Sequence, residues 1–309
     1  MNHGKNCQDG KQRWAIALHG GAGTIPRDSS EARKQQHIVA LTEALTIGRD
    51  ILAQGGTSLD AVEQVVRYLE DCPLFNAGRG AVFNREGVNE LDAAIMDGRD
   101  LSAGAVAAVR YVKNPISLCR RIMEDGEHVL MAGRGAEAYA RNSELELMDD
   151  AYFHTEYRYN QWQRELEIPT AAVNRGTVGA VAMDVRGNLA SATSTGGLAN
   201  KMPGRVGDSP VIGCGTFADN TTCAISCTGN GEEFIRKTVA SRIALQMELK
   251  AQSLDDAMKD VVMNRLSRDS GGVIGVDAQG NAVLHYNSAG MNRGAADSTG
   301  RFQVAIWEW

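Results

Sequence analysis

The chain has 309 residues, enough to bury the core of one large domain or two ordinary ones. Its net charge of −6 and its lack of any Lys/Arg block exclude a general nucleic-acid binder. No run is long and apolar enough for a membrane span, and residues 1–13 lack the apolar centre of a signal peptide. The six cysteines form no Cys-x-x-Cys pair, which disfavours a zinc site, and a chain this long with a conventional core does not need a disulfide framework. We therefore expect a reduced, cytoplasmic protein.

The first half of the chain predicts strands mixed with helices. An apolar strand over 14–18 runs into a glycine turn over 20–23, and a helix over 30–53 ends at Gly55-Gly56. A second helix begins at Thr57 or Ser58 and stops before Pro73. Strand-like residues then surround Val82, and the small apolar run 104–109 is typical of a strand covered on both faces. Helical stretches follow near 117–123 and 133–140.

Periodicity fades between 142 and 176 and then returns as hairpins. We expect the first half of this polar stretch to pack on the body, and a linker near 157–176 to become mobile once the chain is cut. Strands over 178–184 and 189–194, and over 272–276 and 282–286, each flank an Asp-x-x-Gly-Asn turn. Helices are predicted over 232–250 and 254–266, and the run 291–309 carries no motif that we can interpret. The order of elements indicates a layered α+β domain.

The Gly176–Thr177 bond lies where the polar stretch meets the first hairpin, and a self-cleaving chain would cut there. A threonine hydroxyl is a weak nucleophile that needs a base beside it. Cleavage would give Thr177 a free α-amino group with a pKa of about 8, so one residue would hold both nucleophile and base. Gly176 has no Cβ and can adopt a strained backbone that brings its carbonyl to the Thr177 hydroxyl. Taken alone, Gly-Thr is simply a β-branched residue that opens a strand.

The neighbouring motifs change that reading. In chain order they are His19-Gly20-Gly21-Ala22-Gly23, the Gly176-Thr177 junction, Ala192-Thr193-Ser194-Thr195-Gly196-Gly197, Pro203-Gly204-Arg205-Val206-Gly207-Asp208-Ser209-Pro210 and Ser226-Cys227-Thr228-Gly229-Asn230-Gly231-Glu232. In this order they resemble the plant-type L-asparaginases, also called isoaspartyl peptidases or β-aspartyl dipeptidases, which are N-terminal-nucleophile hydrolases. The resemblance runs from about residue 14 to about residue 290, and the bacterial branch is the most similar.

The resemblance implies a single domain with a four-layer αββα sandwich. It implies self-cleavage into an α subunit, 1–176, and a β subunit, 177–309, assembled as an (αβ)2 heterotetramer. The implied reaction is hydrolysis of β-aspartyl dipeptides and L-asparagine to release L-aspartate, without a catalytic cofactor or metal. The loop over 69–79 resembles one that holds a structural sodium ion through backbone carbonyls.

The same resemblance implies the site residues. Thr195 would orient Thr177, and the Thr228 hydroxyl with the Gly229 N–H would form the oxyanion site. Arg205 would bind the substrate α-carboxylate in a two-pronged manner and Asp208 its α-ammonium. Gly231 would contact that amine through its carbonyl.

Asn76 matches an asparagine near the nucleophile, and His19 is not taken as a base, because the glycines after it account for the motif. Asn230 departs from the threonine or histidine of better-known relatives.

Each residue has an ordinary alternative. Thr195 is equally a β-forming residue, Asn76 a turn residue, and Arg205 with Asp208 a surface ion pair. A glycosylasparaginase or a threonine aspartase remains the alternative within the superfamily. The non-enzyme alternatives are a cleavage-silent scaffold or a glycine-rich phosphate binder, although no Gly-x-x-x-x-Gly-Lys-Ser/Thr motif is present.

Overall fold

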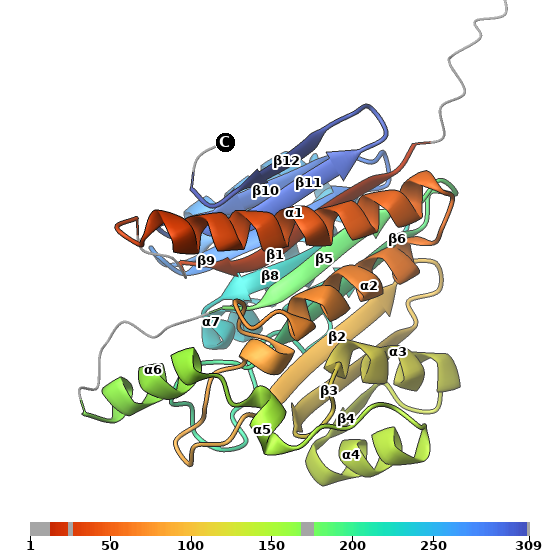
Figure 1. The fold of residues 1–309 in the computed structure, drawn as a ribbon. Coiled ribbons are helices and arrows are strands. Elements are labelled where there is room, and N and C mark those ends of the chain that lie inside the picture. Colours follow the sequence, from red (N-terminus) through yellow and green to blue (C-terminus); the bar gives the residue numbers. More distant parts are fainter. Residues whose placement is uncertain (1–12, 24–26, 168–175, 308–309) are drawn as a thin grey trace, which may run out of the picture.

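The computed structural model describes residues 13–23, 27–167 and 176–307, and two sheets with helices on their outer faces make up the fold (Figure 1). The larger sheet has the strand order β12-β11-β1-β5-β6-β2-β3-β4, in which only β3 and β4 run parallel. Its strands are β1 (Ala15–Ala22), β2 (Leu91–Asp97), β3 (Ala103–Val109), β4 (Leu130–Ala132), β5 (Val178–Met183), β6 (Leu189–Thr195), β11 (Met291–Asp297) and β12 (Phe302–Ala305). The smaller antiparallel sheet has the order β10 (Ala282–Tyr286), β9 (Gly271–Asp277), β8 (Cys223–Gly229) and β7 (Thr216–Ala218).

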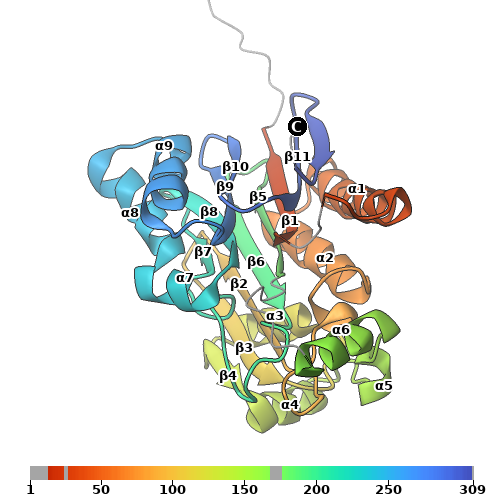
Figure 2. The ribbon, with the colours of Figure 1, turned by 90° about the vertical axis from the view of Figure 1, so that its left-hand side faces the viewer.

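Helices cover the face of each sheet that is turned away from the other sheet (Figure 2). On the larger sheet they are α1 (Glu31–Ala53), α2 (Ser58–Asp71), α3 (Pro115–Asp125) and α4 (Gly133–Asn142). On the smaller sheet they are α8 (Val239–Lys250) and α9 (Leu254–Lys259), with α7 (Gly231–Lys237) before them. No helix within the described ranges combines the length and the apolar character needed to cross a bilayer.

Alternate side chains of β1 pack on the helices and on the smaller sheet. Ile16 and Leu18 join the apolar cluster under α1 and α2, whereas Ala15 and Ala17 join the cluster between the two sheets. Successive side chains of a strand point to opposite faces, so a strand buried on both faces is apolar throughout. Small alanines on the inner side allow the sheets to pack closely together.

Most of the predicted elements are present. Thr57 caps α2 by accepting a hydrogen bond from Asp60 N, and the two hairpins β5–β6 and β9–β10 form as expected. Their turns place Gly187 and Gly280 at φ of 82° and 80°, which a glycine adopts without strain. The strand over 104–109 and the helices near 117–123 and 133–140 are also confirmed, as β3, α3 and α4.

Three predictions are wrong in detail. Val82 is not in a strand, because Asn76 and Asn89 side chains take up its backbone N–H and carbonyl. The helix predicted over 232–250 breaks at Thr238, which has a φ of 47°. After the break, the first N–H groups of α8 donate to the carbonyls of Cys214 and Gly213. The last turns of the helix predicted over 254–266 are π-helical, over Asp260–Arg265.

The polar stretch before the junction has more structure than its sequence indicates. Helices α5 (Asp150–Phe153) and α6 (Glu156–Glu167) occupy it, and Tyr159 and Trp162 pack on Phe83 with ring centroids 6.3 and 5.9 Å away. The predicted linker near 157–176 is therefore helical as far as Glu167 in the intact chain, and 168–175 lies outside the described residues. The C-terminal run that had no motif supplies β11 and β12, which extend the larger sheet beside β1.

Candidate active site

Thr177 lies immediately before β5, and its side chain contacts the neighbouring strand. The residue is 6% exposed, and its Oγ1 donates to Thr195 Oγ1 at 3.3 Å. Thr195 ends β6, whose register pairs Ser194 with Val178, and its hydroxyl also accepts from Gly197 N at 3.0 Å. The hairpin thus places the two threonines side by side.

The Gly176 carbonyl lies between two hydrogen-bond donors. Asn76 Nδ2 donates to it at 2.9 Å and Thr195 Oγ1 at 2.8 Å. Asn76 is itself held in place by bonds to Gly197 O and Val82 N. Negative charge that develops on this carbonyl oxygen would be stabilised by both donors. The backbone of Gly176 depends on Arg175, which lies outside the described residues, so the expected strain is not tested.

His19 lies at the site, although the sequence analysis gave it no role and attributed its motif to the glycines that follow it. It is fully buried in β1, its Nδ1 donates to Thr177 O at 3.0 Å, and its Nε2 lies 2.9 Å from Ser226 Oγ. Burial lowers the pKa of His19 to about 4, so the ring is neutral at neutral pH. A carbonyl can only accept, which assigns the proton to Nδ1 and makes the Ser226 hydroxyl the donor to Nε2. A single polar residue in an otherwise apolar strand was the signal available in the sequence.

A small cavity joins Thr177 to most of the other predicted residues. Its lining comprises Gly176, Thr177, Thr195, Gly197, Leu198, Arg205, Gly207, Asp208, Ser209, Gly229 and Gly231. Thr228 and Asn76 do not line it, although Asn76 donates to Gly197 O in its wall and Thr228 directly precedes Gly229, which lines it. At about 10 Å³ it has room for about one water molecule, so a dipeptide does not fit in the intact chain.

Arg205 is paired with a residue that the sequence did not indicate. Its Nε and Nη2 donate to the two carboxylate oxygens of Glu232, both at 2.9 Å. Glu232 belongs to the first turn of α7, so this two-pronged bond joins the 203–210 segment to that helix. Nη1 is turned the other way, 2.9 Å from the point that a Cβ on Gly207 would occupy. Asp208, its partner in the alternative of a surface ion pair, makes no hydrogen bond with Arg205 among the described contacts.

Asp208 is a buried carboxylate with spare hydrogen-bonding capacity. It is 5% exposed, and its Oδ2 has no hydrogen-bond partner among the described residues. Burial raises the pKa of Asp208 to about 7, and the nearby Arg205 opposes that rise. A cation that entered the cavity would stabilise the ionised form, since an unpaired buried charge is costly.

The end of β8 has a backbone that fits glycine only. Gly229 has a φ of 155°, and a Cβ there would lie 2.3 Å from Ser270 O. Just before it, Thr228 Oγ1 accepts from Ala22 N at 3.2 Å, which leaves the hydroxyl proton of Thr228 available to donate.

The loop after α2 brings backbone carbonyls close together. A Cβ on Gly80 would lie 2.0 Å from Phe75 O and 2.8 Å from Pro73 O, and one on Gly78 would lie 2.5 Å from Glu70 O. No described N–H group donates to the carbonyls of Pro73 and Phe75. Oxygen ligands of this kind fit a hard cation such as sodium.

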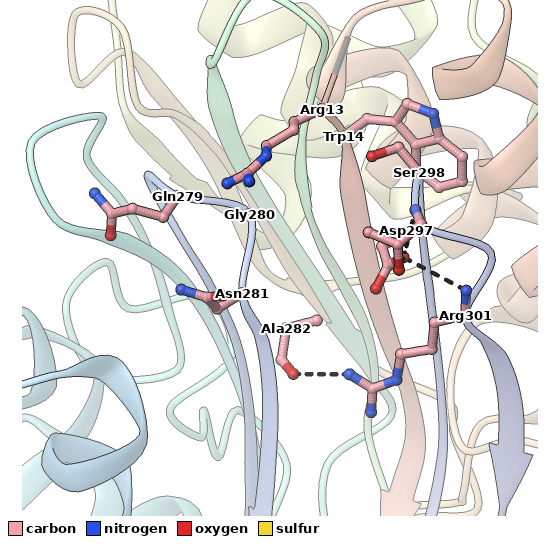
Figure 3. Close-up of a pocket in the computed structure, with 10 residues that line it drawn as sticks. Arg13, Trp14, Gln279, Gly280, Asn281, Ala282, Asp297, Ser298 and Arg301 are labelled. Atoms are coloured by element: carbon pink, nitrogen blue, oxygen red, sulfur yellow. Dashed lines mark hydrogen bonds between the residues drawn. The ribbon is translucent and has the colours of Figure 1, made fainter. Parts of the chain in front are cut away.

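A wider hollow of about 290 Å³ lies elsewhere (Figure 3). Arg13 and Arg301 point into it between the turns of β9–β10 and β11–β12. It adjoins the end of β1 where Ala15 pairs with Met183, which is the far end of β5 from Thr177. None of the predicted site residues lines it.

Comparisons with known proteins identify the family of the chain. The asparaginase family matches residues 12–306. The chain is 48% identical to an isoaspartyl peptidase of Salmonella typhimurium over 90% of this chain and 93% of the relative. It is 45% identical to an isoaspartyl peptidase of Escherichia coli over 90% of this chain and 91% of the relative. It is 40% identical to a probable isoaspartyl peptidase/L-asparaginase 2 of Arabidopsis thaliana over 96% of this chain and 99% of the relative. The chain belongs to the asparaginase family whose members include the isoaspartyl peptidases.

Proposed function

We propose that this protein hydrolyses β-aspartyl dipeptides and L-asparagine and releases L-aspartate, with Thr177 as the nucleophile. One observation carries the proposal: the cavity beside the Thr177 hydroxyl is lined by Arg205, whose Nη1 is not used by Glu232, and by Asp208, whose Oδ2 has no hydrogen-bond partner among the described residues. These groups match the α-carboxylate and the α-ammonium of a free aspartyl unit. The names of the related isoaspartyl peptidases support the substrate class.

The intact chain is the precursor in this proposal. The Thr177 hydroxyl attacks the Gly176 carbonyl carbon while Asn76 and Thr195 stabilise the oxyanion through the bonds described above. The C–N bond breaks, the Thr177 nitrogen takes up the proton as a free amine, and water hydrolyses the resulting ester. The products are chains 1–176 and 177–309. Departure of Gly176, which lines the cavity, makes room for substrate.

Catalysis then repeats the same chemistry on the substrate. The free amine of Thr177 takes the proton of its own hydroxyl as the hydroxyl attacks the side-chain carbonyl of the aspartyl unit. The Thr228 hydroxyl and the Gly229 N–H stabilise the oxyanion, and Gly231 contacts the substrate amine through its carbonyl. The leaving amine departs with the proton, and water releases L-aspartate from the Thr177 ester. His19 holds the Thr177 backbone carbonyl throughout: both of its ring nitrogens are engaged, by Thr177 O and Ser226 Oγ, and burial keeps the ring neutral by lowering its pKa to about 4.

The wider expectations remain part of the proposal. The helix-covered pair of sheets supports an αββα sandwich of the N-terminal-nucleophile type, and we expect cleaved protomers to pair as (αβ)2 in the cytoplasm. A sodium ion held by the carbonyls of Glu70, Pro73 and Phe75 would stiffen the loop that carries Asn76.

A comparison of three substrates tests the proposed function. With Arg205 and Asp208 holding the two charges, β-Asp-Leu presents its side-chain carbonyl to Thr177, whereas α-Asp-Leu presents the wrong carbonyl. N-acetyl-β-Asp-Leu lacks the ammonium and leaves Asp208 unpaired, which costs roughly 2–5 kcal/mol, or on the order of 30-fold or more in kcat/KM. Similar rates for all three substrates would refute the assignment of these two residues.

A further inference from the structure

A buried lysine lies behind the substrate loop, which we define as residues 196–208. The Lys201 side chain is fully buried, its Nζ donates to Glu90 O at 3.0 Å, and it lies 4.0 Å from Glu90 Oε2. Lys201 does not line the cavity that holds Thr177, and the reaction described above does not use it. A fully buried ammonium is costly unless it is compensated by other groups.

The compensating charges come from β2 and the residue before it. Asp92 is fully buried opposite Thr195 in the β2–β6 register, with Oδ1 accepting from Ala108 N at 2.8 Å and Oδ2 unpartnered among the described residues. Burial raises the pKa of Asp92, and Lys201 is the charge that most opposes this rise. Burial likewise lowers the pKa of Lys201, which Asp92 and then Glu90 oppose.

The cluster formed by Glu90, Asp92 and Lys201 contacts the substrate loop near Arg205 at two places. Lys201 Nζ lies 3.1 Å, and Arg205 Nη1 3.3 Å, from the point that a Cβ on Gly197 would occupy. The Glu90 carboxylate accepts from Gly204 N at 3.0 and 3.1 Å, and Gly204 immediately precedes Arg205. Lys201 therefore lies near the guanidinium, Glu90 holds the backbone immediately before it, and Arg205 is among the charges that act on Asp92.

We propose that Lys201 is a positioning residue for recognition of the substrate α-carboxylate, because it neutralises Asp92 and Glu90 and so keeps Arg205 directed at the substrate. Without Lys201, the buried Asp92 carboxylate and the partly buried Glu90 carboxylate are left uncompensated near the guanidinium, attract it away from the cavity and repel an incoming carboxylate. The inference rests on the proposed assignment of Arg205 to the α-carboxylate.

Charge-compensating variants test this role. Lys201→Met removes the charge and keeps the length of the chain, and its KM for β-Asp-Leu is expected to rise roughly 10-fold, with a smaller change in kcat. Adding Asp92→Asn to Lys201→Met removes the uncompensated carboxylate and should recover most of that loss. Lys113→Met is the control, since Lys113 pairs with Glu146 on the surface and should leave both constants unchanged. A loss that Asp92→Asn does not rescue would overturn the proposal.

Asp92→Asn alone is expected to change KM for β-Asp-Leu in the direction opposite to Lys201→Met. The amide oxygen can still accept from Ala108 N, Lys201 is then opposed by Glu90 only, and KM for β-Asp-Leu is expected to fall. This variant decides the matter if Lys201→Met does not fold, and an unchanged or higher KM would contradict the proposal.

A substrate variant separates this inference from the proposed function. In an analogue of β-Asp-Leu whose aspartyl α-carboxylate is a carboxamide, Lys201→Met should cost no more than about 2-fold in kcat/KM. An equal loss on both substrates would make Lys201 merely structural and overturn its role. If the unmodified protein hydrolyses the amidated and free substrates equally well, the assignment of Arg205 itself fails, whatever Lys201 does.

Discussion

Replacing His19 tests how the nucleophile is held. His19→Leu leaves Thr177 O without its donor in the buried interior, whereas the Ser226 hydroxyl, 2.7 Å from Thr193 Oγ1, keeps one hydrogen-bond partner. One unsatisfied buried polar group costs about 1–3 kcal/mol, so the free energy of unfolding should fall by about that amount. His19→Asn can still present an N–H near the position of Nδ1, and should cost about half as much.

Urea unfolding of uncleaved protein measures this cost. Thr177→Ala serves as the common background, because a cut chain would not unfold as a single unit. The pH dependence provides a second readout. The unfolded His19 binds a proton near pH 6.5 and the folded one only near pH 4, so stability is lost as pH falls through that window, by roughly 3 kcal/mol in all. His37 has a pKa lowered in the same way and adds a similar loss, which persists in the variants. Equal stability of His19→Leu and its background, or an unchanged pH slope, would refute the reasoning.

Three further perturbations have definite expected results. The pKa of Asp208 in the free protein is about 7, so KM for β-Asp-Leu should rise as pH falls below 7, and a flat KM between pH 5.5 and 8 would contradict its role. In Gly231→Ala the new Cβ would lie 2.8 Å from Arg205 Nη2 and 3.0 Å from Asp208 Oδ1, so KM should rise more than about 10-fold while cleavage at Gly176–Thr177 on a gel is retained. Replacing sodium by choline should lower Tm by a few degrees, since an ion bound only by the folded state stabilises it, and the same Tm in both salts would remove the proposed sodium site.

Local patterns predicted much of the fold because they act over a few residues. The Thr57 cap, the Asp-x-x-Gly-Asn turns and the end of α1 before Gly55-Gly56 each depend on neighbours in the sequence. The same turn chemistry recurs at Asp297, whose carboxylate accepts from Thr299 N and Arg301 N. That pattern lacks the terminal asparagine of the other two turns, which explains why the hairpin of β11 and β12 was missed.

Long-range contacts limited the prediction of the site. His19 meets Thr177 across 158 residues, and Arg205 meets Glu232 across 27, so neither contact leaves a periodic signal. Val82 has strand-like composition, but the side chains of Asn76 and Asn89 compete for its backbone. The predicted site residues in the cavity were identified through family motifs, and their roles beyond placement stay predictions.

Mass measurement of the purified protein tests the central claim most directly. Scaling 33.2 kDa by chain length, the account predicts fragments of about 19 kDa for 1–176 and about 14 kDa for 177–309, the second beginning with a free Thr177 that serves as its own base. Thr177→Ala should remain at 33.2 kDa without activity on β-Asp-Leu, and Thr177→Ser should retain some cleavage and some turnover. A protein that hydrolyses β-Asp-Leu while its chain stays intact would contradict Thr177 as an N-terminal nucleophile.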